Sequence, residues 1–502
     1  MTRTKTMALS LGWNFIGKIG DAAGLFAVNI VVARSLGVHE YGVYAFLMST
    51  AQLVLTLGSA GLDTALTRHI PLLDPGSRHS AIRYLLRRLL ILRTAIVLMV
   101  FVATSIALGL PSAIPASPFL GCLFLGGFVL FRSVAQMLGW AMIAQLETRV
   151  PTIIVVVVRA VEILGVLVLA SLDLQILLVL GYLTATGLLQ VCLLARLCKP
   201  SLRGAETRVP LRPVVTFGGI YFVNVLVDYF LGRYGDVLFL TKLLPESASA
   251  GLYDAGAGIV QAAALAATAG FGGVTFALFS GFSPQGGGSI ERMRDFYLVL
   301  VRVLSTVTIP IFVLLLIDPA PLVQLLFSER FVQAAPVVQV LAGFRIAARL
   351  FGGGENAEFL LTLGKVVAVV SFGIGSAVVN IAGDVLLIPH YGAMGAVAAT
   401  GAANLLVTIG TYVKVRQISG ARFQMSSFLR LLTGSGIAAY LVFTAHSGLA
   451  HFPPLAHLAL YFILLAIVFL AVKPLLAIDL ELLERIRPGI SRLLRLYVRA
   501  VP

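Results

Sequence analysis

The sequence is a succession of apolar runs, each roughly 20 residues long, separated by short polar segments. About 20 residues of α-helix cross the ~30 Å hydrocarbon core of a bilayer. Backbone groups in lipid have no water to bind, so only helices or closed barrels span it. The runs are too long and too continuous for the alternating strands of a barrel. The chain is therefore predicted to be an all-α protein that crosses a membrane many times.

Composition and charge support this prediction. Charged residues make up 12% of the chain and the mean hydropathy is +0.98, whereas a soluble domain carries about 25% charged residues. The formal net charge is +15, and most Lys and Arg residues lie in the short connections between apolar runs. This distribution follows the positive-inside rule, so we interpret the charge as a membrane feature and do not expect nucleic-acid binding.

We expect about 14 transmembrane helices. Two sets of six are predicted at 11–33, 43–66, 89–110, 119–143, 152–171 and 174–194, and at 214–240, 250–279, 297–317, 335–361, 366–388 and 393–413, with a further pair at 428–445 and 455–476. Arginine-rich and arginine-poor loops alternate along this series. By the positive-inside rule both termini are predicted to be cytoplasmic, and helical spans in place of barrel strands indicate an inner membrane.

The series predicts five regions. Residues 1–195 and 214–416 form two pseudo-symmetric six-helix lobes, and residues 196–213 form a cytoplasmic linker between them. Residues 417–478 hold the extra transmembrane pair. Residues 479–502 form a basic amphipathic tail, which either lies along anionic headgroups or stays solvated in the cytoplasm.

A short internal repeat supports duplication of the six-helix block. A polar turn is followed by Gly42, Val43 and Tyr44 after the first span, and by Gly251, Leu252 and Tyr253 after the seventh. Duplicated halves are typical of transporters, whose substrate site lies near the bilayer midplane between the repeats.

Ionisable side chains inside the predicted spans are candidates for lining a polar cavity, because each costs at least about 2.5 kcal/mol to insert. The cations predicted to bind substrate are Lys18, Arg132, Arg345 and Arg349. Ammonium and guanidinium groups attract anions, and guanidinium suits phosphate oxygens. The cargo is therefore predicted to be anionic, for example a diphosphate headgroup.

Acidic residues occur in the same helices. Asp21, Asp63 and Asp228 either hold Na⁺ or exchange protons to couple transport to a gradient, or they balance neighbouring cations. Arg159 and Glu162 are three residues apart on one helix and are interpreted as a packing ion pair.

No sequence motif indicates an enzyme or a nucleotide-driven pump. The chain has no HExxH motif, and the glycine run at 283–289 lacks the lysine of a phosphate-binding loop. The loops are also short for a membrane-embedded transferase. We therefore expect a transporter without enzymatic activity or cofactor, coupled to H⁺ or Na⁺.

Three stretches resemble a known family. They are LGVHEYGVYAF from Leu36, FSERFVQAAPVVQVLA from Phe327 and LIPHYGAMGAVAAT from Leu387. In order and spacing, residues 9–416 resemble the polysaccharide-biosynthesis flippases of the Wzx type. These belong to the multidrug/oligosaccharidyl-lipid/polysaccharide exporter (MOP) superfamily.

The resemblance implies two six-helix lobes in a V shape around a central cationic cavity, with alternating access and no ATP hydrolysis. The implied cargo is a polyprenyl-diphosphate-linked oligosaccharide, a precursor of a surface polysaccharide such as O-antigen or exopolysaccharide. Implied partners are membrane lipids, a polysaccharide polymerase and a chain-length regulator. Because the extra helix pair departs from a twelve-helix pattern, a lipid II flippase remains an alternative, as does a cation-coupled multidrug exporter of the same superfamily.

Overall fold

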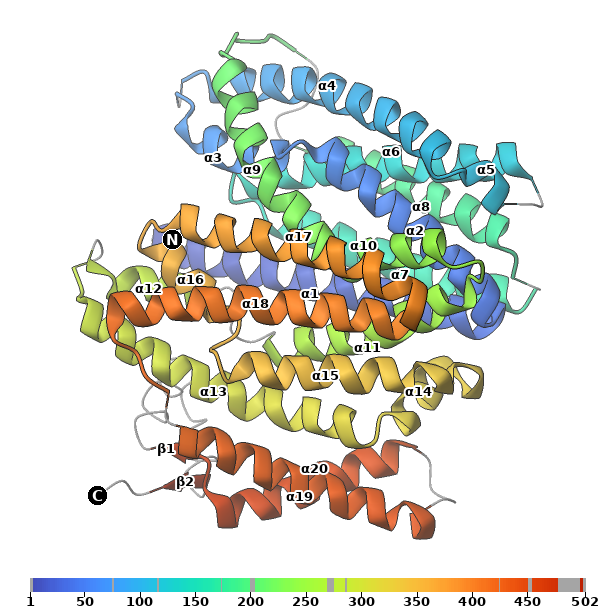
Figure 1. The fold of residues 1–502 in the computed structure, drawn as a ribbon. Helices are drawn as coiled ribbons and strands as arrows, with labels where there is room; N and C mark the ends of the chain where they lie inside the picture. Colours follow the sequence, from blue (N-terminus) through green and yellow to red (C-terminus); the bar gives the residue numbers. More distant parts are fainter. Residues whose placement is uncertain are drawn as a thin grey trace. The chain divides into compact units, whose positions relative to one another are not determined.

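The computed structural model describes residues 3–499 apart from 75, 115–116, 173, 199–203, 269–274, 285–286, 424, 450–453 and 477–496. These residues are almost entirely helical (Figure 1). The exceptions are short connections, 3₁₀ turns and one parallel pairing of the two-residue strands β1 (Leu475–Leu476) and β2 (Val498–Arg499). The predicted all-α class is confirmed.

The chain divides into two compact units, Met1–Asp254 and Ala255–Pro502. The first contains α1 (Arg3–Leu36), α2 (Val38–Ser59), α3 (Leu62–His69), η1 (Ile70–Leu72), α4 (Arg78–Ala107), α5 (Leu110–Ala113), α6 (Pro118–Ile143), α7 (Arg149–Ala170), α8 (Ile176–Leu197), α9 (Arg212–Phe230) and α10 (Arg233–Leu243). Helix α11 (Ala248–Thr268) begins in this unit and continues into the second. The division into six-helix lobes at residues 1–195 and 214–416 stays a prediction.

The second unit continues with α12 (Thr275–Phe282), α13 (Ile290–Ile317), α14 (Ala320–Phe327), η3 (Glu329–Ala334), α15 (Ala335–Arg349), α16 (Glu355–Thr362), α17 (Val366–Tyr391), α18 (Ala393–Ser419), α19 (Met425–Leu449) and α20 (Pro454–Val472). Within it, α17 packs along α18, and the final pair α19 and α20 packs against α13 (Figure 1). Most of the predicted amphipathic tail, residues 479–502, lies outside the described residues; Tyr497–Arg499 are described.

Within the described residues, 13 helices are long and apolar enough to cross a membrane. The predicted span 250–279 is not among them. Helix α11 covers Ala248–Thr268, and residues 269–274 of the predicted span lie outside the described residues. The prediction of a multi-pass membrane protein is confirmed, with one fewer span than expected by this measure.

Three predicted continuous spans are broken in the structure. The span 43–66 is interrupted between α2 and α3, where Ala60 and Gly61 adopt left-handed φ values of 44° and 69°. The span 214–240 breaks at Gly232, between α9 and α10. The span 335–361 breaks where Gly352 and Gly353 have φ values of 88° and 65°, which glycine adopts without steric cost. The three consecutive glycines at 352–354 thus lie in a full break between α15 and α16.

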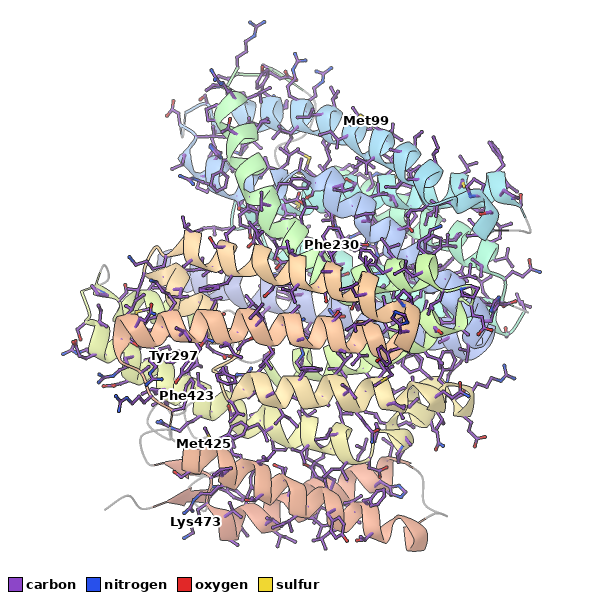
Figure 2. The ribbon with its side chains drawn as sticks, viewed as in Figure 1. Met99, Phe230, Tyr297, Phe423, Met425 and Lys473 are labelled. Carbon is purple, nitrogen blue, oxygen red and sulfur yellow. The ribbon has the colours of Figure 1, made fainter. Side chains whose placement is uncertain are left out.

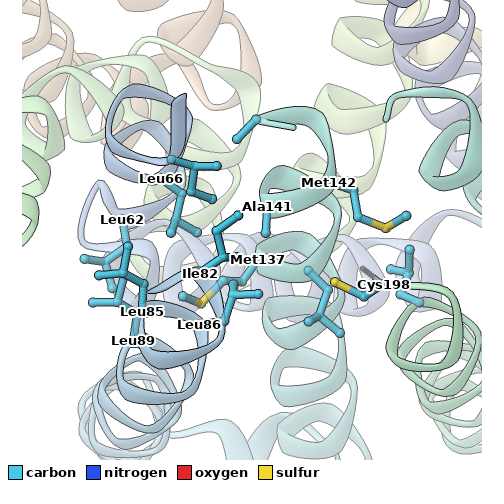
Figure 3. Packing of buried hydrophobic residues seen from close by; sticks show 14 of the residues in the cluster. Leu62, Leu66, Ile82, Leu85, Leu86, Leu89, Met137, Ala141, Met142 and Cys198 are labelled. Atoms are coloured by element: carbon cyan, nitrogen blue, oxygen red, sulfur yellow. The ribbon is translucent and has the colours of Figure 1, made fainter. Parts of the chain in front are cut away.

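One apolar core of the first unit lies where α3, α4, α6 and α8 meet (Figure 3). It includes Leu62, Leu66, Ile82, Leu85, Leu86, Leu89, Met137, Ala141, Met142 and Cys198. Burial, and secondarily the charge of Glu147, raises the pKa of the Cys198 thiol to about 11. Cys198 is thus an unreactive core residue, whereas Cys192 is exposed on α8.

The two copies of the repeated Gly–aliphatic–Tyr motif contact each other. A Cβ atom on Gly42 would overlap the carbonyl oxygen of Ser247, and one on Gly251 would lie 2.5 Å from the carbonyl oxygen of Val38. The Ser247 hydroxyl lies 3.0 Å from His39 Nδ1 beside this crossing. Glycine is therefore required at both positions, because the backbone of the opposite segment occupies the space that a side chain would fill.

Substitution of Gly42 by alanine is expected to destabilise the protein by about 1–3 kcal/mol, the usual cost of overpacking. The new methyl group would push the Ser247 backbone away from α2. Thermal unfolding of the detergent-solubilised protein would measure the loss. Gly375→Ala in α17 is the matched control, because its Cβ would meet nothing within 4 Å. Equal unfolding temperatures for the two variants would contradict the proposed steric role.

Candidate functional site

The first unit encloses a cavity of about 380 Å³ among its membrane-spanning helices. Its walls come from α1, α2, α6, α7, α8, α10 and α11. The charged residues that border it are Lys18, Asp21, Arg132, Arg159, Arg233 and Asp254. The lining has four cations and two acids, and the buried Glu162, which contacts Arg132 and Arg159, brings the formal charge of the group to +1. A cavity with this charge, in a low-dielectric surrounding, favours an anionic guest.

Close packing of α1 against α7 positions part of this lining. Cβ atoms on Gly17, Gly20 and Gly24 would each lie within 3 Å of a side chain on α7. Small residues at this spacing allow two helices to approach closely in a membrane. The approach brings Asp21 of α1 to Arg159 of α7, with Nε donating to Oδ1 at 2.7 Å.

The centre of the site is a buried charge network on α6, α7 and α8. Glu162 is fully buried and accepts hydrogen bonds from two guanidinium groups. Arg132 Nη2 lies 3.2 Å from Glu162 Oε1, and Arg159 Nη1 lies 2.5 Å from Glu162 Oε2. With Asp21 on the far side of Arg159, the network contains two cations and two acids and is formally neutral.

Helix α8 completes this network from the opposite side. The Thr186 hydroxyl donates to Glu162 Oε1 at 3.1 Å, and Arg132 Nη1 donates to the side-chain oxygen of Gln190. The network therefore fixes Arg132 and Arg159 at the cavity wall. Arg159 and Glu162 form the packing ion pair that was predicted from the sequence. Arg159 also borders the cavity.

Lys18 differs from the arginines. Its side chain is exposed at the cavity, and it has no ion-pair or hydrogen-bond partner among the residues that the structure describes. The neighbouring network is neutral, so the uncompensated charge of the cavity on this side comes from Lys18. An ammonium group in this position can contact an anionic guest without first breaking an internal pair.

A second polar group borders the cavity on α10 and α11. Arg233 Nη1 lies 3.4 Å from Asp254 Oδ1, and the Tyr41 hydroxyl donates to Asp254 Oδ2 at 2.7 Å. Arg233 Nη2 also donates to the Tyr234 hydroxyl at 3.3 Å. Arg233 and Asp254 lie inside the predicted spans 214–240 and 250–279, but they were not predicted as site residues.

The structure thus brings Lys18, Asp21 and Arg132 together, three of the seven predicted site residues. Two others lie in the first unit and do not line the cavity. Asp63 pairs with the buried Arg93, and Asp228 is exposed on α9, where its Oδ2 accepts from Asn224 at 3.4 Å.

The remaining two predicted cations lie on α15 in the second unit. Arg345 is exposed, and Arg349 Nη1 pairs with Glu355 Oε2 at 2.9 Å. Arg349 and Arg302 border a small cavity of about 30 Å³ beside Phe423. Figure 2 shows Phe423 near Tyr297, and the ring centroids are 5.9 Å apart. The roles of Arg345, Arg349, Asp63 and Asp228 in transport stay predictions.

Membrane-spanning helices with breaks and a charged cavity are typical of membrane transporters, and solved structures identify the fold of this chain. The lipid II flippase MurJ, in an inward closed conformation, superposes with a TM-score of 0.72 over 90% of this chain and 97% of its own, at 12% sequence identity. An inward-facing multidrug resistance MATE family transporter of the MOP superfamily superposes with a TM-score of 0.59 over 80% of this chain and 95% of its own, at 14% sequence identity. A MOP superfamily transporter from Pyrococcus furiosus Vc1 superposes with a TM-score of 0.52 over 83% of this chain and 96% of its own, at 13% sequence identity.

At these identities the likeness establishes the fold, which is that of the MOP superfamily. The sequence profile of the family described as polysaccharide biosynthesis protein matches residues 31–336, more than half of the chain. The chain belongs to this family, and the resemblance found in the sequence is confirmed. No functionally curated protein sequence matches the chain significantly.

Proposed function

We propose that this protein is a flippase that moves a polyprenyl-diphosphate-linked oligosaccharide, the precursor of a cell-surface polysaccharide, across the bacterial inner membrane. Membership of the polysaccharide biosynthesis family supports the process. The single observation that supports the anionic cargo is the net positive cavity of the first unit, with Lys18 unpaired among the described residues. Lys18, Arg132 and Arg159 would hold the diphosphate oxygens through charge-assisted hydrogen bonds.

The proposal also includes the energy source of transport and the partner proteins. Transport would proceed by alternating access without a nucleotide, and Asp21, one of the two acids at the cavity, would exchange H⁺ or Na⁺. Both termini would face the cytoplasm, and a polymerase and a chain-length regulator would act on the exported precursor. The solved relatives named above are transporters and flippases, which agrees with a role other than an enzyme.

A lipid II flippase is the second candidate, because the MurJ superposition extends over 90% of this chain. Its cargo also carries a diphosphate, so the charge of the cavity does not separate the two. A multidrug exporter is less favoured. An organic cation would be attracted by a net acidic cavity, whereas the lining here has four cations and two acids.

Deletion of the gene should leave the lipid-linked oligosaccharide on the cytoplasmic leaflet while lipid II is still processed. Extraction and mass analysis of lipid-linked sugars, with a leaflet-specific probe for the sugar, would measure the stalled precursor. Accumulation of lipid II with arrest of growth would instead establish the second candidate. Unchanged glycolipids with altered dye efflux would reject both flippase assignments.

A further inference from the structure

One end of the first unit carries five exposed arginines, which we call the basic platform. They are Arg68, Arg87, Arg88, Arg208 and Arg212. They lie at the end of α3, in the first turns of α4, and in the linker and first residue of α9. The described parts of segments 68–92 and 204–217 contain two acids, Asp74 and Glu206. The platform therefore keeps a strong positive charge.

Hydrogen bonds hold the linker along α4 and so fix the positions of the arginines in the platform. The amide of Thr207 donates to the carbonyl oxygen of Ser80 at 3.3 Å. Arg87 Nη1 donates to Glu206 Oε1 at 3.0 Å, and Arg83 donates to the carbonyl oxygen of Ala205. These bonds hold the linker arginines near those of α4.

The other end of the platform is also fixed. Helix α3 packs against α9, and the Arg68 guanidinium lies 4.3 Å from the ring centroid of Phe217. A cation over an aromatic face is held electrostatically and keeps its donors free for another partner. Arg68 and Arg212 are thereby placed on the same packed pair of helices.

The depth of these arginines is set by the apolar residues that follow them. On α4, Arg87 and Arg88 are followed one turn later by Ile91, which is 59% exposed, and Leu92, which is 38% exposed. On α9, Arg212 is followed by Val215, which is 40% exposed. Exposed aliphatic side chains on a spanning helix face lipid, so on both helices the arginines lie about one turn, or ~5 Å, outside the hydrocarbon.

We propose that the basic platform is a binding site for the headgroups of anionic phospholipids. Guanidinium groups suit phosphate oxygens, and arginines at headgroup depth on two packed helices present several such groups to one leaflet. A soluble polyanion would need the arginines to project into water, whereas here they border the lipid-facing surface. By the positive-inside rule this is the cytoplasmic leaflet.

The test uses the full-length protein in phosphatidylcholine nanodiscs with trace spin-labelled phosphatidylglycerol or phosphatidylcholine. The preference for phosphatidylglycerol is the ratio of the two immobilised fractions. The variant Arg87→Gln/Arg88→Gln/Arg208→Gln should lower this ratio by about fivefold or more, since each surface arginine attracts anionic lipid by about 1 kcal/mol. The corresponding lysine triple variant should keep most of it, and 0.5 M salt should weaken it in the native protein.

The matched control removes three arginines from the second unit, as Arg292→Gln/Arg294→Gln/Arg422→Gln, and should change the ratio little. An equal loss in the two glutamine variants, with unchanged unfolding temperatures, would overturn the proposal, because net charge alone would then explain the preference. Displacement of the lipid by millimolar inorganic phosphate or by heparin would also overturn it, in favour of a free phosphate or a soluble polyanion.

Discussion

Substitution of Glu162 by alanine should destabilise the protein by about 3–5 kcal/mol, the usual cost of removing one partner from a buried ion pair. Glu162 is fully buried and is shared by Arg132 and Arg159, whose side chains are each 9% exposed. Without it, two guanidinium groups would face each other at membrane depth with only Asp21 as a counter-charge. Thermal unfolding in detergent, monitored by fluorescence of a thiol-reactive dye or by circular dichroism, would measure the effect.

Two variants separate charge from packing in this network. Glu162→Gln keeps the side-chain volume and should lie between the native protein and Glu162→Ala. The double variant Glu162→Ala/Arg132→Met removes one cation with its partner and should recover part of the lost stability. If Glu162→Ala unfolds at the native temperature, or if the double variant is less stable than either single one, the network does not have the role assigned here.

Reversal of charge at Lys18 should abolish transport without affecting folding. Lys18→Glu changes the formal charge of the lining together with Glu162 from +1 to −1 and places a carboxylate where the diphosphate would bind. Transport should fall more than about tenfold, because one lost ion pair of 1.4 kcal/mol or more already gives that factor. The precursor stalled on the inner leaflet would be measured as for the deletion strain.

Because Lys18 has no partner among the described residues, its replacement should leave the unfolding temperature within the small range of surface substitutions. Lys18→Arg should retain transport. Lys365→Glu, an equal charge reversal at an exposed residue before α17, is the control and should leave transport unchanged. Full activity of Lys18→Glu in a folded, membrane-inserted protein would refute the cationic cavity as the binding site.

The helical class and most of the spans could be predicted because each span is a local property. Twenty apolar residues must form a helix in lipid whatever their neighbours do. Breaks were harder to predict. Three consecutive glycines, as at 352–354, are a local signal of a break, whereas the breaks at Ala60 and Gly232 depend on packing in the folded unit.

The candidate site could be predicted only in part. Charge inside an apolar run selected Lys18, Asp21 and Arg132, and the structure places all three at one cavity, while their roles in transport stay predictions. The same criterion selected Asp63, which pairs with Arg93 and does not line the cavity, and Arg349, which pairs with Glu355 in the other unit. The position of a residue along a span gives its depth in the membrane. It does not show whether the side chain points into the cavity, toward another helix or toward lipid.

The sequence alone therefore determined that this chain is a multi-pass helical membrane protein with costly charges inside its spans, because hydrophobic length and charge are properties of each segment. The tertiary structure alone decided which charges neutralise one another and which remain available to a guest. Glu162 satisfies two arginines because α6, α7 and α8 bring their side chains within hydrogen-bond distance, and Lys18 is left uncompensated because no described acid reaches it. Electrostatic energy depends on distances across helices, and only folding sets those distances.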